Sequence, residues 1–224
     1  MEELYTQYVT LKSQEISDLL SLFQQAASDH QAVLGSGREE IQRCGQLWMI
    51  TRQKLVFYRV PFSGENAAIR TWLTEARHGM YLRQYELSDA EGNVLCRAAA
   101  VWTLVDAKSR ALSQLRLDAP LHREEEQLPR FPLLRPMETE REYSFTVPVE
   151  YLDENGHMNN AHYFDAVAQI LPKDRILSAA QVDYHTEACE GEALTIGCTT
   201  ENNSLLIQGQ SDRGLCFRMK LEYQ

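Results

Sequence analysis

The division of the chain is set by residues 119–139, which read APLHREEEQLPRFPLLRPMET. Four of the seven prolines lie in this stretch, at Pro120, Pro129, Pro132 and Pro136. Proline lacks the N–H that a central strand donates, and it restricts the backbone of the residue before it. The composition therefore predicts an extended linker at 119–139, which divides the 224 residues into segments 1–118 and 140–224.

The first segment has the pattern of a strand, one long helix and four further strands. Apolar side chains recur every three or four residues between positions 17 and 34, as on one face of a helix that Ser17 or Asp18 caps and Gly35 ends. We expect His30, on that apolar face, to be a core histidine with satisfied hydrogen bonds. β-branched and aromatic residues mark the expected strands at 5–12, 47–59, 67–76, 80–87 and 94–105.

The second segment repeats this order of elements without an evident repeat of sequence. A strand is expected at 143–151 and a shorter helix at 159–171, which Pro172 ends. Further strands are expected at 176–185, 193–200, 204–210 and 215–223. One apolar helix can bury its face against an antiparallel sheet that wraps around it. The fold class predicted for the chain is therefore α+β, with two similar units in tandem.

Charge and cysteine content exclude several classes of protein. The chain has 22 Lys and Arg against 32 Asp and Glu, a net charge of −10, which argues against a broad nucleic-acid surface. No signal peptide and no apolar run approaching the ~18 residues of a membrane span is evident, so we expect a cytoplasmic protein without membrane contact. The five cysteines include no C-x-x-C pair, which gives no support for disulfides or a zinc ribbon.

The densest polar cluster is DENGHMNNAHY, residues 153–163, between an expected strand and an expected helix. One interpretation is a turn, in which Asn-Gly takes positive backbone angles and Asn159 or Asn160 caps the helix. The other is a site for acyl transfer, since carboxylate, amide and imidazole groups can activate water and bind a carbonyl oxygen beside a helix N-terminus. His157 and His162 have the wrong spacing for a helical metal pair and no evident third ligand, so no metal is expected.

Residues 153–163 resemble the motif D-x-N-x-H-V-N-N-x-x-Y of the acyl-acyl carrier protein thioesterases, a family with two hotdog folds in one chain. The resemblance covers nearly the whole chain. Segments of the first half that resemble motifs of the family lie at 46–52, 61–72, 83–92 and 99–106.

The resemblance implies catalytic roles for Asp153, Asn155 and His157, and for Glu187 on the following strand. Plant members carry Cys directly after this Glu, whereas this chain has Ala188 there and Cys189 one residue later. That departure favours water activated by carboxylates over a cysteine nucleophile. The same resemblance implies that segment 1–118 supplies an acyl-chain tunnel, and its 12–18 loop, without His or Asn, is expected to be catalytically silent.

The function implied is hydrolysis of fatty acyl-acyl carrier protein to free fatty acid, which ends fatty acid synthesis. No cofactor is expected, because a thioester is already activated. The carrier is acidic like this chain, so we expect a local positive patch at the tunnel mouth, drawn from Arg52, Lys54, Arg59, Arg77, Arg83, Lys108 and Arg110. A monomer or a homodimer fits the paired units. The alternatives are an acyl-CoA thioesterase, a hotdog hydratase and a non-catalytic acyl-binding hotdog protein.

Overall fold

The computed structural model describes residues 3–124 and 126–224, so Met1 and Glu2 of the predicted first segment and Glu125 of the predicted linker lie outside it. The chain forms two compact units, Met1–Phe131 and Pro132–Gln224. We call them the N-terminal unit and the C-terminal unit. The division between them falls inside residues 119–139. Among the residues described, no helix combines the length and the apolar content needed to cross a membrane.

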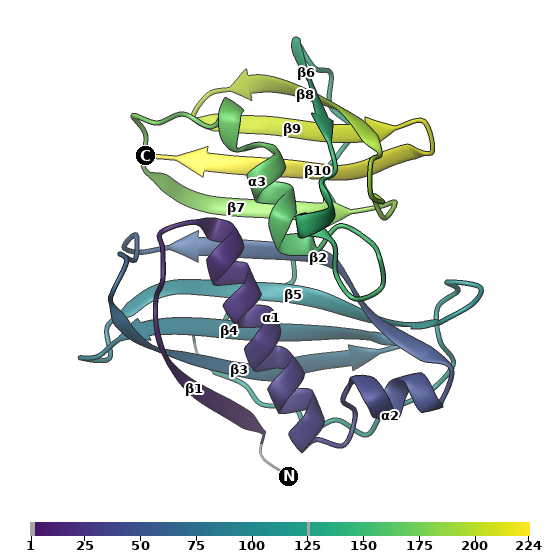
Figure 1. Ribbon diagram of the computed structural model, residues 1–224. Helices are drawn as coiled ribbons and strands as arrows, with labels where there is room; N and C mark the ends of the chain where they lie inside the picture. The colour runs from purple at the N-terminus through teal and green to yellow at the C-terminus, as the bar shows by residue number, and fades with distance from the viewer. Residues whose placement is uncertain (1–2, 125) are drawn as a thin grey trace. The chain divides into compact units, whose positions relative to one another are not determined.

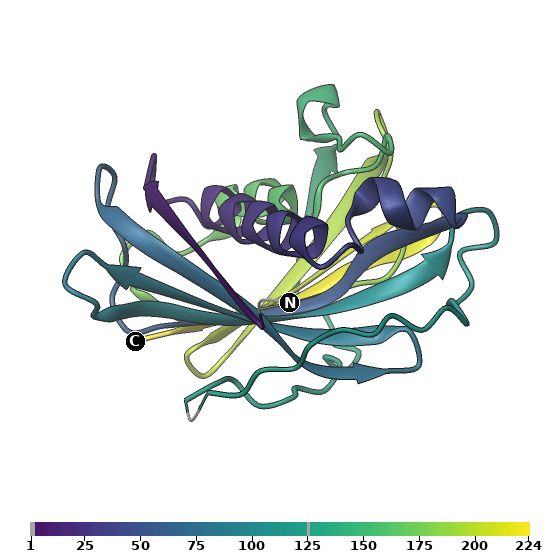
Figure 2. The same ribbon diagram turned by 90° about the horizontal axis from the view of Figure 1, so that it is seen from below.

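The N-terminal unit is an antiparallel sheet with a long helix, α1 (Ile16–Val33), across one face (Figures 1 and 2). Its strands follow in the spatial order β1-β3-β4-β5-β2. Their bounds are β1 Leu4–Thr10, β2 Gln46–Phe57, β3 Asn66–Arg77, β4 Met80–Asp89 and β5 Val94–Asp106. A short helix, α2 (Arg38–Arg43), precedes β2 and was not predicted. All five strands lie where alternating β-branched and aromatic residues predict them.

Helix α1 buries most of the apolar face that its residue spacing predicts, including Leu19, Phe23 and Ala26, whereas Val33 of the same face is exposed. The predicted start is wrong, because the N-cap is Glu15 and no side chain caps it. The Ser13 hydroxyl instead accepts the N–H of Glu15 at 3.0 Å. The predicted end is confirmed: Gly35 takes φ +71°, the left-handed conformation that glycine adopts without steric cost.

The polar layer between α1 and the sheet contains a buried arginine. Arg83 has no exposed surface, and its Nη1 lies 3.0 Å from Nδ1 of His30 and 3.2 Å from Oγ1 of Thr71. Burial lowers the pKa of Arg83 to about 10. The prediction for His30 is confirmed, since this histidine is buried and in hydrogen-bond contact. The inclusion of Arg83 in a surface patch is wrong, because β4 turns this side chain toward α1.

The N-terminal part of residues 119–139 lies on the other face of the same sheet. Phe131 packs with Leu82 and Val101, and Gln84 exchanges two hydrogen bonds with the backbone of Leu128, at 2.9 and 3.2 Å. Arg52 donates to the carbonyl of Phe131 at 2.9 Å. The described residues of this segment form no helix or strand, and Gln84 and Arg52 hold their backbone to the sheet. Arg52 thereby has a structural contact in the N-terminal unit.

The strands of the C-terminal unit pair with their neighbours in antiparallel fashion, in the order β7-β10-β9-β8-β6. Its strands are β6 Arg141–Thr146, β7 Leu177–Tyr184, β8 Ala193–Glu201, β9 Ser204–Ser211 and β10 Gly214–Tyr223. The predicted strand 143–151 ends early, because Val149–Tyr151 forms a 3-10 turn, η1. Antiparallel sheets with helical segments against them confirm the predicted α+β class (Figure 1).

The helix predicted at 159–171 is not continuous. It consists of a 3-10 turn η2 (Asn160–His162), one turn of α-helix α3 (Tyr163–Ala166) and a 3-10 turn η3 (Ala168–Ile170). The break follows from Val167, whose φ of −102° and ψ of 0° leave the α-helical range. After it, the N–H of Leu171 bonds three residues back to Ala168, as in a 3-10 turn. The buried Tyr163 packs edge-on against Tyr184 of β7 and Phe217 of β10, and this packing helps to hold the short pieces, which would not form alone.

Candidate active site

The loop from Asp153 to Met158 is organised by the carboxylate of Asp153. Its Oδ1 accepts the backbone N–H of Asn155 at 2.8 Å and that of His157 at 3.2 Å. Its backbone N–H donates to the His157 carbonyl at 2.7 Å, and Gly156 takes φ +77° at the tip. The turn interpretation of this stretch is therefore correct as local geometry. The same geometry presents the Asn155 and His157 side chains from one tight loop.

Three of the predicted site residues share this loop, and the fourth reaches it from elsewhere. The exposed Asn155 amide donates to Oδ2 of Asp153 at 3.2 Å. Nδ1 of His157 lies 3.4 Å from Oε1 of Glu187, and these two side chains are 22% and 32% exposed. The carboxylate and the imidazole thus lie within ion-pair distance of each other, and Nδ1 of His157 is itself buried. Such a pair can pass a proton to and from a reacting group.

Glu187 does not lie on a strand, contrary to the prediction. Strand β7 ends at Tyr184, and Glu187 follows in the connection to β8. The N–H groups of His185 and Thr186 still donate to β10 carbonyls, at 2.8 and 3.1 Å, after which the backbone leaves the sheet. The departure brings Glu187 to the Asp153 loop, which a continued strand would not do.

Backbone contacts join the two loops. The N–H of Met158 donates to the Ala188 carbonyl at 2.8 Å, and His157 and Cys189 form an isolated antiparallel bridge. The Tyr163 hydroxyl, buried at the start of α3, accepts the N–H of Ala188 at 3.3 Å. Burial raises the pKa of Tyr163, so this phenol stays neutral. His157 and Glu187 are therefore neighbours because their backbones pair.

The structure leaves the helix start after Asn159 less able to bind an acyl oxygen than the sequence predicts. The side chain of Asn159 does cap η2, as predicted, by accepting the N–H of Ala161 at 3.0 Å. That bond occupies one donor on which an acyl oxygen would depend, and the 3-10 turn η2 is only three residues long. His162 takes no part in the cluster, because its Nδ1 lies 2.6 Å from Asp165 and its ring stacks on Tyr151 at 4.4 Å.

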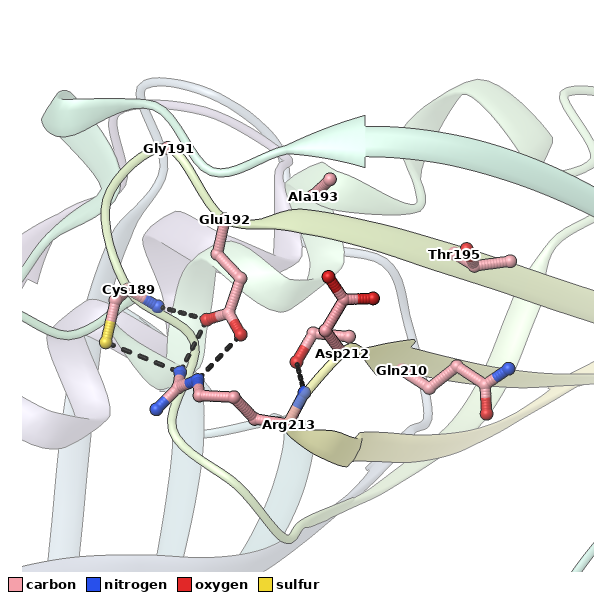
Figure 3. A pocket seen from close by; sticks show the side chains of 9 residues that line it. Cys189, Gly191, Glu192, Ala193, Thr195, Gln210, Asp212 and Arg213 are labelled. Carbon is pink, nitrogen blue, oxygen red and sulfur yellow. Dashed lines mark hydrogen bonds and ion pairs between the residues drawn. The ribbon is translucent and has the colours of Figure 1, made fainter.

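Two residues that the sequence gave no reason to select lie beside Glu187. Arg213, in the turn between β9 and β10, and Glu192, just before β8, form an ion pair next to Cys189 (Figure 3). The Arg213 guanidinium also lies 3.4 Å from the Cys189 sulfur. An open pocket of about 790 Å³ lies here, lined by Cys189, Thr195 and Gln210 among others. In the sequence, only the hairpin turn at Asp212–Gly214 marks this region, and a turn pattern does not indicate a function.

No grouping that suits a metal ion occurs in residues 3–124 and 126–224: no three His, Cys, Asp or Glu side chains converge there. The chemistry that the cluster supports on its own is proton transfer by a carboxylate and an imidazole, with an amide nearby to bind an oxyanion.

Comparison with known proteins assigns this architecture. Two tandem sheet-and-helix units, of which the second carries the polar cluster, define the class of double hotdog proteins. Residues 5–119 match the sequence model of the acyl-ACP thioesterase N-terminal domain, and residues 134–222 match that of the C-terminal domain. The chain belongs to the acyl-ACP thioesterase family.

Curated relatives are distant. A palmitoyl-acyl carrier protein thioesterase of Gossypium hirsutum is 25% identical over 215 residues, covering 84% of this chain and 51% of the relative. Oleoyl-acyl carrier protein thioesterase 1 of Arabidopsis thaliana is 24% identical over 224 residues, covering 87% and 60%. The chain spans about half the length of most of the curated relatives that it matches.

Solved structures show the fold. An acyl-ACP thioesterase from Bacteroides thetaiotaomicron superposes with a TM-score of 0.83 over 100% of both chains at 17% identity. A 12:0-ACP thioesterase from Umbellularia californica gives a TM-score of 0.83 over 100% of this chain and 98% of the other at 16% identity. The predicted arrangement of two hotdog folds in one chain is confirmed.

Proposed function

We propose that the protein hydrolyses the thioester of fatty acyl-acyl carrier protein and releases the free fatty acid. The observation that carries the proposal is the 3.4 Å contact between His157 and Glu187, beside a loop ordered by Asp153, in a chain whose two halves both match the family. The names of the curated relatives, which include palmitoyl- and oleoyl-acyl carrier protein thioesterases, support a fatty acyl substrate.

In the proposed reaction, a water oxygen attacks the thioester carbonyl carbon while the Glu187 carboxylate takes the proton from the water. The exposed Asn155 amide is the side chain placed to donate to the oxyanion that develops. Collapse of the tetrahedral intermediate restores the carbonyl and breaks the C–S bond. The pantetheine thiolate leaves and takes the proton back through His157. The thioester is activated already, so the reaction needs no cofactor.

The geometry favours different roles for the two carboxylates. Both oxygens of Asp153 already accept hydrogen bonds from its own loop, which suits it to fix Asn155 and His157 in place. Glu187 contacts an imidazole instead, which suits it to exchange a proton. We therefore assign to Asp153 the role of ordering the loop, and to Glu187 and His157 the role of proton transfer.

The carrier is the part of the proposal that the fold leaves most open. Of the cations expected at a docking patch, Arg83 is buried and Arg59 is paired with Glu65, which leaves neither free to meet an acidic partner. An acyl carrier protein thus remains the proposed partner, with acyl-CoA as the alternative. A cytoplasmic location, a monomeric or homodimeric state and the absence of catalysis in the N-terminal unit stay predictions.

The test compares the purified protein on one acyl chain carried by acyl carrier protein and by CoA. His157→Ala and Glu187→Gln should each lower kcat by roughly 10²–10⁴-fold, the range that a general acid–base residue contributes. Glu190→Gln is the matched control, because Glu190 is an exposed carboxylate of the same connection. Full activity of both site variants would refute the assignment of the catalytic site. Faster turnover of acyl-CoA would refute acyl carrier protein as the preferred carrier of the substrate.

A further inference from the structure

The connection from Glu187 to Glu192 carries the proposed proton acceptor but lies outside the sheet. On one side, Ala188 is held by the bonds to Met158 and Tyr163 described above. On the other side, the connection folds back on itself, with the N–H of Glu192 donating to the Cys189 carbonyl at 3.1 Å. Gly191, at φ +69°, makes this reversal and donates to the Val147 carbonyl at 2.9 Å. Glu187 thus lies at the start of a connection whose later residues are held by backbone hydrogen bonds.

Arg213 reaches this connection from the β9–β10 turn (Figure 3). Its Nε donates to Oε1 of Glu192 at 2.8 Å and its Nη2 to Oε2 at 2.5 Å, a two-point fork on one carboxylate. The same Nη2 donates to the Glu187 carbonyl at 2.5 Å. Oε2 of Glu192 also accepts the N–H of Cys189 at 2.9 Å. One ion pair thus holds the backbone of the connection at Glu187 and at Cys189.

The environment of this pair makes it persistent. Glu192 is only 14% exposed, although Arg213 is 49% exposed. The hydrogen bonds from Arg213 hold the pKa of Glu192 at about 2, and those to Glu192 raise the pKa of Arg213. Both groups are therefore charged throughout the neutral range. A fork of this kind also restricts orientation, which a single ammonium group would not do.

We propose that Arg213 and Glu192 are positioning residues, which hold the Glu187 backbone so that its carboxylate meets His157. The inference rests on the proposed function of Glu187. The contact of Glu187 with His157 is long, at 3.4 Å, so a small shift of the backbone is enough to break it. Displacements of about 1 Å at a catalytic group can cost on the order of 100-fold in rate. The pair therefore governs the rate of the chemical step and has little part in substrate binding.

Steady-state kinetics of the full chain test this role. Arg213→Gln and Glu192→Gln should each lower kcat by roughly 10- to 100-fold while KM changes by less than about twofold. Arg213→Lys keeps the charge without the fork, so it should recover part of the rate. Arg43→Gln is the control, because it breaks an exposed ion pair with Glu39 in α2 of the N-terminal unit and should leave kcat unchanged.

A double-mutant cycle separates positioning from an independent role. If Arg213 acts through Glu187, then Arg213→Gln combined with Glu187→Gln should be no slower than Glu187→Gln alone. Additive losses would overturn the proposal, as would full activity of Arg213→Gln and Glu192→Gln when Glu187→Gln is inactive. Full activity of Glu187→Gln would overturn both this inference and the proposed site. Glu192→Gln preserves the size of the side chain, so its kinetics test the proposal if Arg213→Gln does not fold.

Discussion

Gly209 in β9 is a position where a single methyl group should disturb the C-terminal unit. It lies opposite Phe217 of β10, and the aromatic ring covers it. A Cβ built at Gly209 would lie 2.0 Å from Cε1, 2.7 Å from Cδ1 and 2.8 Å from Cζ of that ring. Phe217 is fully buried and contacts Tyr163 edge-on, with ring centroids 5.2 Å apart. The ring therefore has no free direction in which to move without disturbing Tyr163.

The expected cost of Gly209→Ala follows from this overlap. Adding a methyl group to a well-packed core costs roughly 1–3 kcal/mol, and the directness of the clash places this case toward the upper end. A loss of 1 kcal/mol lowers the unfolding midpoint by about 2–4 °C in a chain of this length, so a fall of about 5–10 °C is expected. Movement of Tyr163 would also loosen its bond to Ala188, so kcat should fall as well.

Thermal unfolding followed by circular dichroism measures this effect. Gln210→Ala is the matched control, because it places an alanine at the next, exposed position of β9 and should shift the midpoint little. Phe217→Leu in the Gly209→Ala background removes the ring edge, and the two changes together should cost at least about 1 kcal/mol less than their sum. An unchanged midpoint for Gly209→Ala would refute the argument that the ring is confined.

Three further predictions concern charged groups. Arg83→Met should raise the free energy of unfolding by about 1 kcal/mol or more in urea titrations, since no carboxylate in the described residues pairs with this buried guanidinium; a less stable variant would contradict this. The pKa of Glu192 falls from 4.5 to about 2 on folding. The stability from its pair with Arg213 should therefore be complete above pH 4.5 and vanish as the pH falls toward 2, so wild type and Glu192→Gln should converge there. Asp153→Ala removes the acceptor of two backbone N–H groups and should cost about 1–2 kcal/mol, with faster hydrogen exchange at His157; unchanged exchange would argue against the loop role.

Strand positions were predictable because they depend on short-range patterns. Alternation in β10 and the aromatic and β-branched content of β2 to β5 mark these strands to within a few residues. Helix breaks were not predictable in the same way. The pattern at 159–171 suits a helix, and only packing against the sheet shows that Val167 interrupts it. The short helix α2 has too few residues for its periodicity to stand out.

The residues of the candidate site also differ in how far the sequence identifies them. Asp153, Asn155 and His157 lie within five residues of one another, and the hydrogen bonds that order them span two to four positions. A local motif can therefore identify them. Glu187 was identified only through the family resemblance, and its place off the strand was missed, because nothing in its own neighbourhood separates it from a solvated side chain.

By itself, the sequence determined the two units, the positions of their strands along the chain, the proline-rich segment between them and the Asp153 loop, because each depends on residues close together in the chain. Only the tertiary structure decided which charges act together. Arg213 meets the Glu187 carbonyl from 26 residues away, and Arg83 meets His30 from 53 residues away. The packing of α1 on the sheet and the paths of the connections after β7 and β9 set these contacts, and a local pattern of residues does not encode which distant side chains will meet.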